Sequence, residues 1–464
     1  MTSKKYHTKW ANIENSIQLD AAKSNGPHRS VLFITVSFPP VCSPRSIRCL
    51  YFVNHLVQSG FKVDVVTLNL QGGISRVDID LCNKLNPMVR LYRIPSHVRA
   101  LLIKPNTGQG ATRYKGIVHR ILYPRALRVG KSIIRKLAFP DPFIFDVPWV
   151  LKEVLRRMCR YHYDFIVTSA HPVSTYFLGW IVKLKSPSTK WVMDLGDPWA
   201  FNEELVWGRG ILRILTLFIE KIFLSRVDGL VVTNPQIRDL YSAIFGLSRE
   251  SICVIPQGVD VKIYDKIIQA RNERGNSGDP QCIRFVYTGI FYDRIREPAV
   301  LYQALQLLPN EIKRKICFDF YGYIPKKFTS DISDDMGRRI VNFHGNVSHL
   351  SAIRAQCYAD ILVLFGNKGR LQIPGKLYEY IVARKPILYI SQAQADTVAN
   401  LIRDCRIGEV AQADPISIHT AIKKLVSYYE NSALDNQYRM FQDIVSLSWE
   451  ARANKFIHFL KGLL

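Results

Sequence analysis

The segment with the most specific chemistry in this sequence lies between residues 373 and 388. Pro374-Gly375 is predicted to open a helix, whose first free amides are suited to binding a diphosphate. Glu379 follows one turn later, where a carboxylate can accept hydrogen bonds from both hydroxyls of a ribose. Arg384-Lys385-Pro386 is expected to end the helix and start a strand. The spacing therefore indicates a nucleotide site, although it also fits an ordinary loop, helix and strand with an exposed glutamate.

Three polar residues of the first half lie at the ends of apparent strands and are candidates for binding a sugar or for catalysis on it. His171 comes after the apolar run 165–168, where an imidazole can bind a hydroxyl or accept its proton. Asp194 and Asp197 lie at the end of the next run. A histidine in this position is often structural, and Asp197-Pro198 also fits a turn or a helix N-cap. The spacing leaves both roles open.

The elements expected to position these candidates are short apolar runs that alternate with longer amphipathic ones. This is the pattern of a parallel sheet with helices on both faces. In the first half we expect a helix at about residues 45–58, ended by Gly60, and strands at 31–36, 62–68, 90–94, 165–168, 190–194 and 229–233. In the second half we expect strands at 252–255, 283–288, 317–321, 340–344, 361–365 and 386–390, with 252–255 opening a second sheet. A length of 464 residues fits two such α/β domains.

The composition is that of a soluble globular protein, with 48% hydrophobic and 22% charged residues. No run of about 18 apolar residues predicts a membrane span. Residues 1–29 lack the apolar segment of a signal peptide, so we expect a loose tail in the cytoplasm. The nine cysteines form no CxxC pair, which indicates reduced thiols. With no metal constellation, Walker A or GxSxG motif, we expect neither a metal nor a cofactor.

Segments spread over nearly the whole chain match one known pattern in the expected order. Ile373-Pro-Gly-Lys-Leu-Tyr-Glu-Tyr380 is similar to the PGKLxEY segment of family 4 retaining glycosyltransferases, of the group 1 type that serves bacterial polysaccharide and lipid-linked glycan synthesis. Val254-Ile-Pro-Gln-Gly-Val-Asp260 resembles the family's VIPNGVD. Further similar segments are residues 31–40, 45–48, 164–174, 191–199, 344–348 and 358–361.

This resemblance implies a GT-B fold, in which two Rossmann-like domains face each other across a cleft. The expected limits are a tail at 1–29, an acceptor domain at 30–235, a nucleotide-sugar domain at 236–447 and a helix at 448–464 that returns to the first domain. The implied chemistry is hexosyl transfer with retention and without a metal. The acceptor hydroxyl attacks on the face that the diphosphate leaves, and a diphosphate oxygen takes its proton.

The resemblance also assigns a donor site, with two departures from the family pattern. Leu371 stands where the family usually keeps a second glutamate, eight positions before Glu379. Ile290 stands where an arginine usually contacts the diphosphate, so Arg294 or Arg296 is expected to supply the charge, with Arg296 favoured and counted as catalytic. The implied donor residues are Gly289, Arg294, Arg296, Asn346, Val347, Pro374, Gly375, Lys376, Leu377 and Glu379.

On the acceptor side, the loop that follows the first strand lacks the Gly-Gly turn of many relatives. It should still lie at the carboxyl end of that strand, where open α/β sheets bind ligands. Ser43, Arg45, Arg48 and Asp194 are the residues assigned to this side, although the two arginines also fit a purely structural role.

The charge of the chain is concentrated in one block. Residues 81–140 carry 13 Lys or Arg and no Asp or Glu, within a chain of net charge +25. Apolar residues at helical spacing share this block, which is the composition of an interfacial helix on an anionic membrane. Packing on the first domain with solvated charges is the alternative. Few aromatic residues interleave the block, so nucleic acid is not expected as a partner.

The sequence therefore predicts a glycosyltransferase that uses a UDP- or GDP-sugar and a saccharide or lipid-linked acceptor. We expect it to be cytoplasmic and peripheral on the inner face of the cell membrane. A nucleotide-sugar epimerase or hydrolase of the same fold, and a non-catalytic scaffold of glycan synthesis, are the alternatives.

Overall fold

The computed structural model describes residues 29–70, 77–97, 138–201, 210–274, 282–291, 298–325, 328, 340–367, 371–393, 396–439, 441 and 443–464. Contacts group the chain into two compact units. One comprises residues 1–196, 219–231 and 456–464, and the other comprises residues 197–218 and 232–455. The predicted domain limits near residues 30, 235 and 448 stay predictions.

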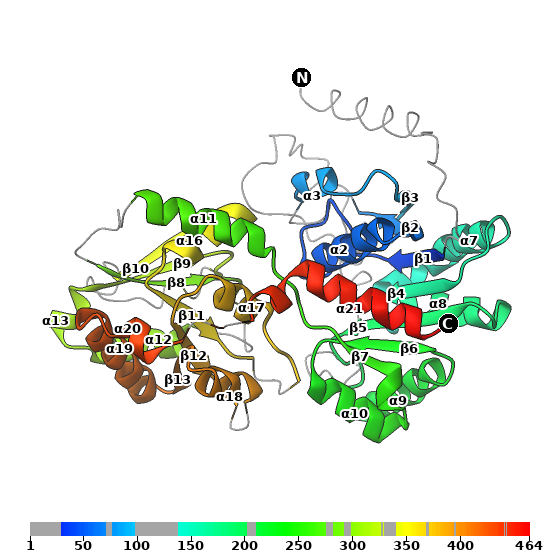
Figure 1. The fold of residues 1–464 in the computed structure, drawn as a ribbon. Helices are drawn as coiled ribbons and strands as arrows, with labels where there is room; N and C mark the ends of the chain where they lie inside the picture. The colour runs from blue at the N-terminus through cyan, green and yellow to red at the C-terminus, as the bar shows by residue number, and fades with distance from the viewer. Residues whose placement is uncertain are drawn as a thin grey trace, which may run out of the picture. The chain divides into compact units, whose positions relative to one another are not determined.

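The first sheet has seven strands in the order β3-β2-β1-β4-β5-β6-β7 (Figure 1). The strands are β1 (Ser30–Thr35), β2 (Lys62–Asn69), β3 (Arg90–Pro95), β4 (Phe165–Ser169), β5 (Lys190–Gly196), β6 (Gly229–Val232) and β7 (Ile252–Val254). Neighbours from β3 to β5 pair in parallel. The central strands β4 and β5 are almost entirely buried, as expected where helices cover both faces of a sheet.

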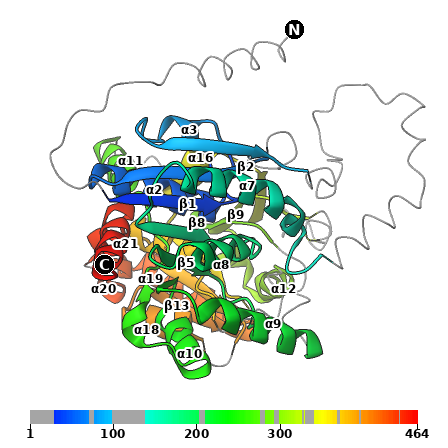
Figure 2. The same ribbon diagram turned by 90° about the vertical axis from the view of Figure 1, so that its right-hand side faces the viewer.

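Local sequence explains the helices that cover this sheet. Helix α2 (Pro44–Gln58) begins where the Ser43 hydroxyl caps the amide of Ser46 at 3.1 Å. Helix α8 (Thr175–Lys185) packs closely on β5, because a Cβ on Gly179 would lie 2.2 Å from the Trp191 indole nitrogen. Figure 2 views α7 and α8 from their own side of the sheet. The other helices up to β7 are α3 (Asp80–Asn83), η1 (Pro142–Asp146), α7 (Val147–Met158), α9 (Gly210–Leu224), α10 (Pro235–Phe245) and η3 (Arg249–Ser251).

The second sheet has six strands in the order β10-β9-β8-β11-β12-β13, and all its pairs are parallel. The strands are β8 (Ile283–Thr288), β9 (Ile316–Tyr321), β10 (Val341–Gly345), β11 (Ile361–Phe365), β12 (Ile387–Ser391) and β13 (Gly408–Gln412). The helices after β7 are α11 (Val261–Arg274), α12 (Ala299–Leu307), α13 (Asn310–Lys313), α16 (His349–Tyr358), α17 (Gly375–Val382), α18 (Thr397–Asp404), α19 (Pro415–Glu430), α20 (Leu434–Gln437), η4 (Val445–Leu447) and α21 (Trp449–Gly462). The last of them, α21, belongs to the first unit from residue 456 onward.

Two parallel sheets with helices between their strands confirm the predicted fold class. One strand assignment is wrong: 252–255 was expected to open the second sheet, but β7 is an edge strand of the first. The Ile255 amide donates to the Val232 carbonyl at 2.7 Å, beside β6. An apolar run this short fits either sheet, so only its hydrogen-bonded strand partner determines the sheet to which it belongs. Strand β13 was not predicted, because its burial is weak and its sequence is mixed.

Three further findings concern the cysteines, membrane-spanning helices and metal ligands of the described residues. All nine cysteines are free thiols. Among the helices that the structure describes, none has both the length and the apolar character to cross a bilayer. No three potential metal ligands gather anywhere in that same part of the chain.

Candidate functional site

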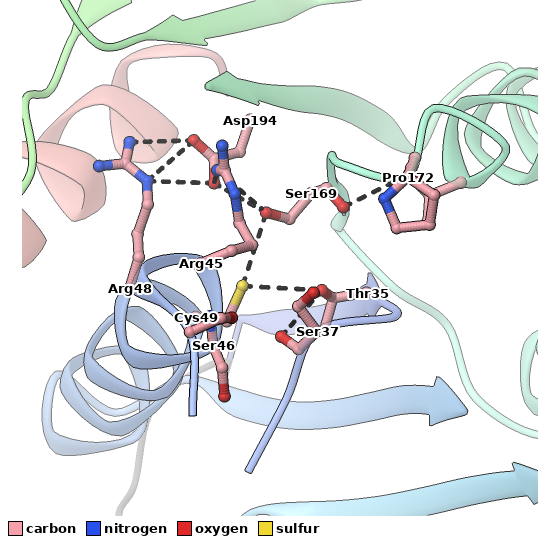
Figure 3. Close-up of polar contacts among 11 residues, drawn as sticks. Thr35, Ser37, Arg45, Ser46, Arg48, Cys49, Ser169, Pro172 and Asp194 are labelled. Atoms are coloured by element: carbon pink, nitrogen blue, oxygen red, sulfur yellow. Dashed lines mark hydrogen bonds and ion pairs between the residues drawn. The ribbon is translucent and has the colours of Figure 1, made fainter. Parts of the chain in front are cut away.

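Two arginines of α2 and one aspartate of β5 form a densely hydrogen-bonded cluster in the first unit (Figure 3). Arg48 donates to Asp194 through Nη2, at 2.9 Å, and through Nε, at 3.1 Å. Arg45 Nη1 donates to Asp194 Oδ2 at 2.7 Å, and the Ser169 hydroxyl of β4 donates to the same oxygen at 2.9 Å. Both carboxylate oxygens are therefore engaged.

Burial and charge act in opposite directions on Asp194, whose side chain is 0% exposed. Burial alone would raise its pKa, but Arg48 and Arg45 reverse the effect and hold the pKa below its ordinary value. A carboxylate with no exposed surface cannot contact an acceptor. The assignment of Asp194 as an acceptor-side contact is therefore corrected: it positions the two arginines.

Arg45 is the member of this cluster that reaches the surface. Its side chain is 16% exposed, whereas that of Arg48 is 1% exposed. Gly196, at the end of β5, has a φ of +56°, and a Cβ there would lie 1.6 Å from Arg45 Nη2. Only glycine fits both the left-handed backbone and this close approach. Of the two predicted arginines, Arg45 is thus the more exposed, and its role toward an acceptor stays a prediction.

The other predicted residues of this sheet edge have mixed outcomes. Ser43 acts as the N-cap of α2, which accounts for its hydroxyl. His171 follows β4 and Asp197 follows β5, so both stand at the carboxyl edge where Arg45 also lies, and both are partly buried. Their catalytic roles remain a prediction.

In the second unit, Glu379 of α17 is held through one oxygen. Oε2 accepts from Lys376 Nζ at 2.6 Å and from Gln356 Nε2 at 2.9 Å, and the Tyr264 hydroxyl lies 3.4 Å away. Within the described part of the chain, no donor bonds to Oε1. The side chain is 20% exposed. The carboxylate is thus fixed but still has an oxygen for a ligand.

Charge keeps this carboxyl group ionised. Burial would raise the pKa of Glu379, but Lys376 and His349 outweigh burial and lower it below its ordinary value. An ionised carboxylate is a strong acceptor for hydroxyl groups. Lys376, whose ammonium group pairs with Glu379 at 2.6 Å, is predicted to bind the donor, and that role stays a prediction.

The start of α17 has the predicted turn. Pro374 stands at the N-cap without a side-chain cap bond, and Gly375 is the first helical residue. The assignment of Leu377 to the donor is corrected, because its side chain is fully buried in the core and its amide donates to the Pro374 carbonyl at 2.9 Å. Leu371, at the position of the missing glutamate, accepts from Asn234 Nδ2 through its carbonyl at 2.7 Å.

The ends of β8 and β10 hold further predicted donor residues. The Gly289 amide donates to the Tyr321 carbonyl at 2.8 Å, and a Cβ on Gly289 would lie 2.5 Å from the Tyr287 hydroxyl. A side chain is therefore excluded at the end of β8. Asn346 and Val347 follow β10 and are exposed. Arg294 and Arg296 lie outside the described residues.

Sequence reasoning missed Gln356, Tyr264, Thr288 and Tyr380, which form a buried hydrogen-bonded network behind Glu379. Thr288 is the residue before Gly289, and Tyr380 follows Glu379. Gln356 and Tyr264 have no sequence signal, because they lie on other helices and only folding brings them to Glu379.

Two parallel sheets of seven and six strands define a protein of the GT-B class. Residues 46–258 match the family described as Glycosyl transferase 4-like domain. These residues, just under half of the chain, are therefore similar to that family, in agreement with the resemblance to family 4. No curated protein sequence matches the chain significantly.

Solved structures share the fold over nearly the whole chain at low identity. HepE of Anabaena, in complex with UDP and glucose, aligns with a TM-score of 0.60 and 12% identity over 94% of this chain and 100% of its own. WaaG, a glycosyltransferase involved in lipopolysaccharide biosynthesis, aligns at 0.54 and 15% over 91% and 98%. UDP-GlcNAc 2-epimerase of Neisseria meningitidis, bound to UDP-GlcNAc, aligns at 0.54 and 10% over 93% and 100%.

Proposed function

We propose that this chain is a metal-independent, retaining glycosyltransferase that transfers a hexosyl group from a UDP-sugar to a saccharide or lipid-linked saccharide. The observation that supports the proposal most is the Glu379 carboxylate, which is ionised and held through Oε2 about one turn after the start of α17. A ribose hydroxyl pair suits Oε1, and a diphosphate suits the helix start. UDP is favoured over GDP because UDP or a UDP-sugar is bound in two of the solved relatives.

The proposed reaction forms a bond between the acceptor oxygen and the anomeric carbon while the bond from that carbon to the diphosphate breaks. A diphosphate oxygen takes the acceptor's proton, so UDP leaves and no enzyme nucleophile is needed. Arg296 is proposed to neutralise the leaving diphosphate. Arg45 and His171 are proposed to bind the acceptor, with Asp197 beside them at the same sheet edge.

A docking surface for an anionic membrane is the second part of the proposal. Of the basic block at 81–140, residues 98–137 lie outside the described part of the chain. Helix α9 offers independent support, because Ile211, Ile214 and Phe218 are exposed on it while its Thr216 and Glu220 are buried. A surface helix with its apolar residues outward suits the headgroup region of a bilayer. A lipid-linked acceptor would require such contact.

Thermal melting with nucleotides tests the enzyme proposal. We expect UDP to raise the melting temperature of the purified protein, and a screen of UDP-sugars should identify one from which UDP is released on adding acceptor. Conversion of the donor sugar without acceptor would favour the epimerase alternative. A protein that binds neither UDP nor GDP would exclude both enzymes and leave the scaffold alternative.

Flotation with liposomes tests the membrane proposal separately. The protein should float with vesicles containing anionic lipid and stay in solution with neutral ones. Phe218→Glu should reduce flotation, whereas the exposed Ile416→Glu on α19 of the second unit should not. Equal flotation of both variants and the wild type would contradict a role for α9.

A further inference from the structure

The donors around Glu379 are distributed unequally between its two oxygens. Lys376, Gln356 and Tyr264 all approach Oε2, whereas no donor of the described residues bonds to Oε1. A carboxylate oxygen can accept two hydrogen bonds, so Oε1 retains its full capacity. Whatever holds Oε2 therefore also determines where Oε1 points.

Gln356 is fully buried, and the orientation of its amide is determined by its partners. Its Oε1 accepts from the Tyr264 hydroxyl at 2.5 Å, and its Nε2 donates to Thr288 Oγ1 at 2.7 Å and to Glu379 Oε2 at 2.9 Å. An ionised carboxylate only accepts, so the amide nitrogen must face Glu379. Turning the amide over would set two acceptors against each other and leave the Tyr264 hydroxyl facing a donor.

The same network joins three elements of the second unit. Gln356 belongs to the last turn of α16, Thr288 ends β8, and Tyr380 lies beside Glu379 in α17. The Thr288 amide donates to the Tyr380 hydroxyl at 2.9 Å. Hydrogen bonds thereby connect Glu379 to the end of β8, where Gly289 has no side chain.

We propose that Gln356 is a positioning residue for nucleotide binding: it holds Glu379 by Oε2, with its own amide fixed by Tyr264, and so presents Oε1 to the ribose hydroxyls of the donor. The inference rests on the proposed function. Gln356 contacts no ligand itself, and its effect acts through the direction of the Glu379 carboxylate.

The substitution Gln356→Glu tests this role with little change of volume. It sets two carboxyl groups 2.9 Å apart, and such a pair retains a proton to higher pH than a single carboxyl. While the new group is protonated, it can still donate to Glu379. We therefore expect the Kd for UDP to be close to that of the wild type at about pH 5.5 and about tenfold higher at pH 8.

The measured quantity is the ratio of variant to wild-type Kd at each pH, by calorimetry with UDP. This ratio cancels the titration of UDP and of the other groups that face Glu379, namely Lys376, His349, Tyr264 and Tyr380. Gln356→Leu should weaken UDP binding about tenfold or more at every pH, and Tyr264→Phe by less. Melting of each protein without UDP shows whether it folds.

The control is Gln269→Glu, since Gln269 also donates to a carboxylate, that of Glu273 at 3.1 Å, but on the exposed surface of α11. Its Kd ratio should stay near one at every pH. If wild-type protein binds UDP while a folded Gln356→Glu variant keeps a ratio that does not change with pH, the inference is overturned and the proposed function stands. Wild-type protein that binds no nucleotide overturns both.

Discussion

Asp194 of β5 and Glu379 of α17 are both carboxylates beside basic side chains, yet the structure uses them in opposite ways. Asp194 is wholly buried and both its oxygens are engaged by Arg45, Arg48 and Ser169. Glu379 is 20% exposed and is held through Oε2 alone. The number of oxygens left over, rather than the presence of an acid beside a base, separates a structural carboxylate from one placed for a ligand.

The largest effect is expected from Asp194→Asn. Removing the charge breaks the ion pair with the buried Arg48, and breaking such a pair costs about 3–5 kcal/mol of unfolding free energy. Urea denaturation measures it. Asp239→Asn is the control, because Asp239 is an exposed partner of Arg238 and Arg249 and should cost less than about 1 kcal/mol. Equal costs for both variants would contradict the structural role of Asp194.

Glu379→Ala should change binding more than stability. Losing an ionised acceptor for two hydroxyls should raise the Kd for UDP about a hundredfold. UDP should then no longer raise the melting temperature. The matched variant Glu273→Ala, at an exposed glutamate of α11, should bind UDP normally. An undiminished melting shift in Glu379→Ala would refute the ribose assignment and with it the contrast between the two carboxylates.

Gly196→Ala tests how tightly the Arg45 cluster is packed. The new Cβ meets Arg45 Nη2 in a backbone of φ +56°, so we expect a loss of about 2–3 kcal/mol. Gly210→Ala is a close match, since Gly210 has a φ of +54° and nothing within 4 Å of the added atom. It should lose only the backbone part, about 1 kcal/mol. Thermal melting of both variants gives the two losses of unfolding free energy, and their difference is the cost of displacing Arg45.

A smaller effect is expected from acid on Asp194. Its pKa in the fold lies below the ordinary value, so its contribution to stability is present above about pH 4 and is lost as pH falls through the folded pKa. The difference in unfolding free energy between wild type and Asp194→Asn should therefore shrink below about pH 4. A difference that stays constant down to pH 2 would show that the charge of Asp194 does not matter.

Much of the fold could be predicted from the sequence, because buried parallel strands are continuous apolar runs and helix starts carry local signals. The helix expected at about residues 45–58 became α2, and residues 283–288 and 361–365 became β8 and β11 with the same limits. β7 was assigned to the wrong sheet, because strand pairing is a contact between distant residues. Leu377 was assigned to the donor by its place in a motif, and its burial shows the limit of that reasoning.

By itself the sequence determined where the chemistry-bearing residues stand along the chain: Glu379 one turn after Pro374-Gly375, and arginines after the first strand. The tertiary structure alone decided which atoms of those residues remain for a ligand. Gln356 and Tyr264 come from α16 and α11 to occupy one oxygen of Glu379, and Arg45 and Arg48 occupy both oxygens of Asp194. Such occupancy depends on packing between segments far apart in the chain, which no local pattern encodes.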